Sequence, residues 1–105
     1  MIKAERISVE DAYPKVQAKE ALLVCGYNDE EKFKTIQLEG AISYSEFESG
    51  LPKISKDQEI IFYCGWPQEA TSAGQAAKYI KLGYKNAKAL TGGVEAWRNA
   101  GFPIK

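Results

Sequence analysis

Two short apolar runs, each ending in a cysteine, constrain the fold of this 105-residue sequence more than any other feature. The first is ALLVC at residues 21–25, and the second is IIFYC at residues 60–64. A strand that is apolar on both faces must be covered on both faces, which is typical of a parallel sheet enclosed by helices. Segments with helical spacing alternate with the strand-like runs. The sequence therefore predicts an α/β domain with a mostly parallel central sheet.

The remaining elements follow from local signals. Ser45 stands three residues before Glu48, as in a capping box, and predicts the start of a short helix. Gly83 is placed to end the helix before it. The polar segment 26–40 is expected to be a solvent-exposed connection. The predicted helices cover residues 9–19, 45–51, 70–82 and 94–100, and the predicted strands cover residues 21–25, 41–44, 59–64 and 87–90.

Length and charge limit the kind of protein this can be. The length suits one domain with its own core, so residues 1–105 are predicted to form a single domain. Lys plus Arg and Asp plus Glu both number 14, and this balance argues against a nucleic-acid or membrane-surface partner. No apolar stretch has the length of a signal peptide or a membrane span, so a cytoplasmic protein is expected.

The sequence contains two cysteines and no histidine. The commonest general base and the commonest zinc ligand are therefore both missing. Two cysteines are too few for a structural zinc site, and we expect no metal and no cofactor. In a reducing cytoplasm, thiols are more often free or reactive than joined in a disulfide.

Cys64 is predicted to lie where a buried strand ends and a helix is about to begin. In open α/β sheets, ligands bind beyond the carboxyl ends of the strands. The helix that follows offers unpaired N–H groups and the positive end of its dipole, so a thiol placed there is easier to ionise. Backbone amides of residues 65–70 would also be suited to surround an anionic sulfur. The alternative is that Cys64 only fills space in the core.

The chain from Phe62 to Trp97 carries several motifs in a distinctive order. They are Tyr63-Cys64, a short loop at residues 65–69, an alanine-rich helix, Gly83-Tyr84, Leu90, Gly92-Gly93 and Ala96-Trp97. In this order they resemble the second half of a rhodanese domain, and residues 22–26 and 38–42 resemble its first half more loosely. The resemblance implies a three-layer α/β domain with a mostly parallel, five-stranded sheet flanked by helices on both faces.

The resemblance also implies a sulfurtransferase mechanism. Cys64 would attack a small sulfur donor as a thiolate, hold the sulfur as a persulfide, and pass it to cyanide, an acceptor thiol or a partner protein. The substrate-binding loop would consist of Gly65, Trp66, Pro67, Gln68, Glu69 and Ala70. Phosphatases of the same fold use a loop one residue longer with an arginine near its end. No arginine lies between Cys64 and Ala70, which disfavours phosphoryl transfer. A monomer or weak homodimer is expected.

The loop departs from the family pattern in three ways. Glu69 stands where the family has arginine, and its charge would repel a dianionic donor such as thiosulfate unless it turns outward or stabilises the helix start. Pro67 removes one N–H donor. Trp66 either packs over the domain or offers an apolar surface to an uncharged donor or a partner protein. Weak activity with thiosulfate is therefore expected. Thr71 and Ser72 are expected to cap the helix or to bind the loop backbone.

Cys25 stands where the family usually has an aspartate. It is either a buried core residue or a redox partner that forms a disulfide with a sulfenic acid or persulfide on Cys64. Three functions stay open on the sequence: a sulfurtransferase that uses Cys64, a non-catalytic binding or regulatory module on the same scaffold, and a thiol redox switch built from Cys25 and Cys64.

Overall fold

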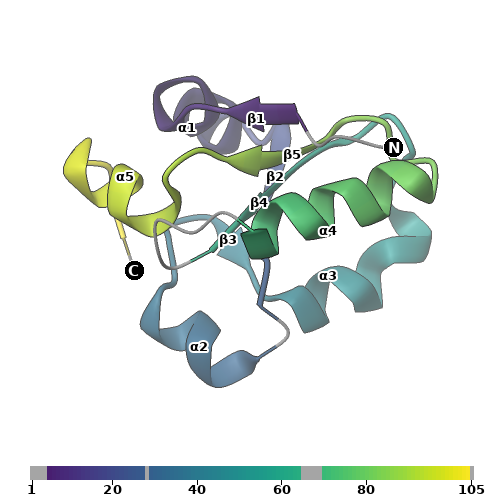
Figure 1. Cartoon of the computed structure of the whole chain (residues 1–105), viewed down its shortest axis with the longest axis horizontal. Helices are drawn as coiled ribbons and strands as arrows, with labels where there is room; N and C mark the ends of the chain where they lie inside the picture. The colour runs from purple at the N-terminus through teal and green to yellow at the C-terminus, as the bar shows by residue number, and fades with distance from the viewer. Residues whose placement is uncertain (1–4, 28, 65–69, 105) are drawn as a thin grey trace.

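Five parallel strands form one sheet at the centre of the computed structural model, which describes residues 5–27, 29–64 and 70–104 (Figure 1). The strands are β1 (Glu5–Ile7), β2 (Ala21–Cys25), β3 (Ala41–Ile42), β4 (Glu59–Tyr63) and β5 (Ala87–Leu90), in the order β1-β5-β4-β2-β3. The helices are α1 (Val9–Gln17), α2 (Glu30–Thr35), α3 (Tyr44–Gly50), the 3₁₀ turn η1 (Leu51–Lys53), α4 (Ala70–Lys81) and α5 (Gly93–Asn99). The predicted fold, including the five-stranded sheet, is confirmed.

The helices cover both faces of the sheet and create two separate cores. One core joins the inner sides of α1, α2 and α5 to one face of the sheet and has Trp97 and Tyr63 among its largest buried side chains. The other joins α3 and α4 to the opposite face and contains the aromatic rings of Phe47, Phe62 and Tyr79. Figure 1 shows α3 and α4 together on one side of the sheet, with α1 on the other.

The continuous apolar runs are explained by the place of their strands. β4 lies between β2 and β5, and its residues from Ile60 to Tyr63 are all fully buried. Alternate side chains of β4 enter opposite cores, because successive residues of a strand point to opposite faces. A strand in this position must be apolar along its whole length, as ALLVC and IIFYC are.

The connection between β2 and β3 differs from the prediction. Residues 26–40 were expected to be a polar connection with its charges in solvent. The charged side chains from Asp29 to Lys34 are exposed, but the prediction missed α2, which occupies Glu30–Thr35. Asp29 starts the helix by accepting hydrogen bonds from the backbone N–H groups of Glu31 and Lys32. Only Phe33 of this helix is buried, so the segment has no apolar periodicity to reveal it.

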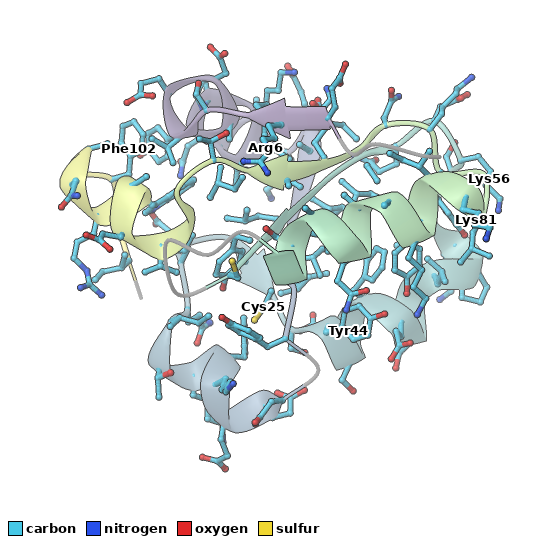
Figure 2. All side chains as sticks on the ribbon, in the orientation of Figure 1. Arg6, Cys25, Tyr44, Lys56, Lys81 and Phe102 are labelled. Carbon is cyan, nitrogen blue, oxygen red and sulfur yellow. The ribbon has the colours of Figure 1, made fainter. Side chains whose placement is uncertain are left out.

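The start of α3 also differs. Ser43, not Ser45, is the N-cap, and its hydroxyl accepts the N–H of Glu46 at 3.0 Å. Tyr44, which was predicted to end a strand, is instead the first helical residue. Figure 2 shows Tyr44 on α3, and its hydroxyl lies 2.9 Å from that of Tyr79 on α4. This buried contact between the two helices explains why the helix begins two residues earlier than predicted.

Candidate active site

Cys64 directly follows Tyr63, the last residue of the central strand β4, and is fully buried at the carboxyl edge of the sheet. Its carbonyl oxygen accepts the backbone N–H of Val94 at 3.0 Å. The first turn of α5 is therefore bonded directly to the cysteine, and the turn that connects β5 to α5 lies immediately before it. This turn uses Gly92 and Gly93, which both have positive φ angles of 79° and 57°. Such angles favour glycine, because other residues rarely adopt them.

Ser72 brings a hydroxyl group to the sulfur of Cys64. It lies in the first turn of α4 and is fully buried. Its Oγ lies 3.7 Å from Cys64 Sγ, within hydrogen-bonding range for sulfur, and either group is able to donate. Sequence reasoning assigned Ser72 to capping or to the loop backbone and missed this contact with the thiol. The only signal was a small polar residue on the inner side of a helix that follows a cysteine.

Gly26 lets α4 approach the ends of the strands. Its N–H donates to the carbonyl of Tyr63 at 2.7 Å, and its carbonyl accepts from Gln75 Nε2 at 3.1 Å. A Cβ atom at this position would lie 3.1 Å from the oxygen of Tyr63 and 3.5 Å from the Cα of Ser72. A side chain here would therefore press against the backbone of Tyr63 and lie in contact with the first turn of α4.

Cys25 ends β2 and pairs in register with Tyr63, not with Cys64. It is a free, fully buried thiol in the core that joins α1, α2 and α5 to one face of the sheet. Burial raises the pKa of Cys25, and the nearby charges of Cys64, Glu30 and Asp29 raise it further against a hydrogen bond from the backbone of Tyr27. Cys25 thus lies in the core on the side of α1, α2 and α5, while Cys64 contacts Ser72 on α4, which covers the opposite face of the sheet. Its role as a redox partner stays a prediction.

The other predicted site residues belong to the segment between Cys64 and α4. Ala70 is the first residue of α4. Gly65, Trp66, Pro67, Gln68 and Glu69 lie outside the described residues, so their binding roles stay predictions. Within the ranges that the structure does describe, no group of three metal-binding side chains lies close enough together to hold an ion. In the same ranges, no helix has both the length and the apolar character needed to cross a membrane.

Solved structures share this arrangement. A human single-domain sulfurtransferase, TSTD1, is 20% identical with a TM-score of 0.74, and the match covers 91% of this chain and 96% of that one. A thiosulfate sulfurtransferase from Pseudomonas aeruginosa is 18% identical with a TM-score of 0.75, over 97% of this chain and 20% of that one. A Rhodopseudomonas palustris protein of unknown function, described as a possible tyrosine phosphatase, is 22% identical with a TM-score of 0.76, over 97% and 85%.

These structural likenesses show the fold, since all three identities are low. A comparison with curated proteins finds no match. The family model for the rhodanese-like domain matches residues 10–100, which contain the whole sheet except β1 and include Cys64, Ser72 and the Gly92-Gly93 turn. The chain therefore belongs to the rhodanese-like domain family.

Proposed function

We propose that this chain is a sulfurtransferase that carries sulfane sulfur as a persulfide on Cys64. The observation that carries the proposal is the position of Cys64 at the carboxyl end of the central strand, ahead of α4, in a chain of this family. Ligands of α/β sheets bind at this edge, and the amino end of a helix favours negative charge. The contact with Ser72 adds a hydrogen-bonding partner for the sulfur without any histidine.

The proposed reaction has two displacements on sulfur. The Cys64 thiolate attacks the outer sulfur of the donor, so that an S–S bond forms on Cys64 and the donor's bond to that sulfur breaks. The donor leaves with the electron pair, as sulfite from thiosulfate or as a thiolate from a low-molecular-weight persulfide. Cyanide or an acceptor thiolate then attacks the bound sulfur, and Cys64 leaves as a thiolate. No external oxidant or reductant is consumed.

Sulfur transfer fits the sequence between Cys64 and Ala70 better than phosphoryl transfer. A phosphate dianion is normally held by an arginine or a comparable cation, and this segment contains none. The segment also has one acidic residue, Glu69, and one proline without an N–H donor. A reducing compartment such as the cytoplasm would keep both thiols available, in agreement with this chemistry.

The proposal is tested by steady-state transfer to cyanide, with thiocyanate formation as the measurement. Thiosulfate and glutathione persulfide are offered as alternative donors, and p-nitrophenyl phosphate as a phosphatase substrate. We expect thiocyanate from both donors, with the persulfide preferred, and no release of p-nitrophenol. Cys64→Ala should form no thiocyanate above the uncatalysed reaction of cyanide with each donor. If neither donor gives product with the wild type, or if Cys64→Ala keeps its activity, the proposal fails.

A further inference from the structure

We propose that Ser72 donates a hydrogen bond to the sulfur of Cys64 whenever that sulfur carries negative charge, and thereby sets the reactivity of the thiol. This inference deepens the proposed function and rests on Cys64 being the nucleophile. It assigns a catalytic role to a serine on α4 that is not part of the segment between Cys64 and Ala70.

The hydroxyl of Ser72 is close enough to the sulfur of Cys64 to bond to it, and both groups are shielded from solvent. Ser72 Oγ lies 3.7 Å from Cys64 Sγ, and both residues are fully buried, so bulk water does not replace this contact. An anion in such a place is costly unless protein groups donate to it. A serine hydroxyl both accepts and donates, and rotation about its C–O bond directs its proton. It accepts from the neutral thiol and donates to the thiolate, so one contact serves both states of Cys64.

The strand before Cys64 and the helix that carries Ser72 are both hydrogen-bonded to the backbone of Gly26. Gly26 bonds to the carbonyl of Tyr63, the residue before Cys64. Gly26 also accepts a hydrogen bond from Gln75, which lies one turn after Ser72 on α4. The strand that carries the thiol and the helix that carries the hydroxyl are therefore both joined to Gly26. This arrangement holds the hydroxyl against the sulfur.

The same contact would serve both chemical steps. During loading, donation from Ser72 favours the attacking thiolate of Cys64. During transfer, the inner sulfur of the persulfide is the leaving group, and donation to it stabilises the thiolate that departs. A hydrogen bond to a charged group is also stronger than one between neutral groups, so its loss should affect reactivity more than stability.

The test is the pH profile of alkylation of Cys64 by iodoacetamide, read by peptide-resolved mass spectrometry so that Cys25 is scored separately. In Ser72→Ala we expect alkylation at neutral pH to slow about ten-fold and the profile to move up by about one pH unit or more. The matched control is Ser43→Ala. It also removes the hydroxyl of a buried serine, but the hydroxyl of Ser43 accepts the backbone N–H of Glu46 at the start of α3. Its profile should match the wild type.

A second variant, Ser72→Thr, keeps the hydroxyl and should keep the wild-type profile. The proposal is overturned if Ser72→Ala reacts like the wild type, if Ser43→Ala shifts equally, or if Ser72→Thr shifts as far as Ser72→Ala. Thermal melting of each variant is measured beside these profiles. Because alkylation requires no sulfur donor, a wild type that never accepts sulfur would end the proposed function while leaving the result for Ser72 readable.

Discussion

The backbone N–H of Val94 donates to the carbonyl oxygen of Cys64 at 3.0 Å, which joins the first turn of α5, just after the turn at Gly92, to the cysteine. The position of Cys64 thus depends on a turn that only glycine suits. Gly92 has a φ of 79°, and a Cβ atom there would lie only 2.5 Å from the Cβ of Ala96. We therefore expect a substitution at Gly92 to disturb Cys64, which directly follows β4.

Gly92→Ala should destabilise the fold and misplace Cys64. The positive φ and the clash with Ala96 together predict a loss of about 1–3 kcal/mol in the free energy of unfolding. We also expect slower loading of sulfur on Cys64. Gly101→Ala is the matched control, because Gly101 has a φ of 80° but no heavy atom within 4 Å of its added Cβ. Urea denaturation and sulfur loading are measured for both. Equal loss of loading in the two variants would show that the turn has no special effect on Cys64.

Cys25→Ala tests whether the second cysteine takes part in the chemistry. The raised pKa of Cys25 keeps it a neutral thiol near neutral pH, and its side chain belongs to the same buried core as Leu23 and Ile61. We therefore expect unchanged sulfur loading and a stability loss of about 1–2 kcal/mol from the smaller side chain. Thiol counting after mild peroxide is the second measurement. Loss of both thiols together in the wild type, with formation of a disulfide, would instead support the redox switch.

Glu59 predicts a specific dependence of stability on pH. Its Oε2 accepts from Lys15 Nζ at 3.0 Å and from Lys88 Nζ at 2.6 Å. Burial alone would raise the pKa of Glu59, but the hydrogen bonds and charges of the two lysines lower it overall. Because the folded-state pKa is lowered, the stabilisation is complete above the ordinary value of 4.5 and is lost as the pH falls through the folded value.

Glu59→Gln should therefore be less stable than the wild type near neutral pH, by about 1–3 kcal/mol, because both lysines lose a charged partner. The difference should shrink in acid, where Glu59 is itself protonated. Asp57→Asn is the control, since the Asp57–Lys85 pair is largely exposed and such pairs contribute about 0–1 kcal/mol. The free energy of unfolding of the wild type and both variants is measured by urea denaturation at several pH values. A difference that stays constant in acid would contradict the lowered pKa.

Glu69→Arg tests the proposed preference against anionic donors. Replacing a negative charge by a positive one between Cys64 and Ala70 should raise the rate with thiosulfate about ten-fold or more, since Coulomb energies of a few kcal/mol at short range remain after partial screening. The rate with a persulfide donor that has no carboxylate, and so carries at most one negative charge, should change less. Glu20→Arg gives the same change of charge at the opposite edge of the sheet, before β2 begins, and should leave both rates unchanged. The prediction requires that the rates with the two donors change by different factors. An equal increase with both donors would indicate a general effect on Cys64 and contradict it.

The parts of the fold that were predictable have strong local patterns. β4, β5 and α4 were predicted nearly to the residue, because continuous apolar runs and alanine-rich helical spacing are local signals. β1 was not identified from its own residues, since it has three residues of which only Ile7 is buried. It exists through hydrogen bonds to β5, at the other end of the sequence. Long-range pairing of this kind leaves no local pattern.

The candidate site was predictable in part. The sequence indicated Cys64 as the nucleophile and placed it at a strand end, where the structure has it. Ser43 and Ser45 both precede a glutamate by three residues, so local capping rules do not show which of them is the N-cap of α3. The contact between Tyr44 and Tyr79 favours Ser43, because it places Tyr44 in the helix. The contact between Ser72 and Cys64 joins α4 to β4 through tertiary packing that Gly26 permits. Spacing along the chain contains no information about that distance.

The most direct test of the central claim is intact-mass measurement after incubation with glutathione persulfide and removal of the excess donor. The wild type and Cys25→Ala should each gain the mass of one sulfur atom, and an acceptor thiol should remove it. Cys64→Ala should gain no mass. A sulfur adduct that persists in Cys64→Ala, or no adduct on the wild type with any donor, would contradict the claim.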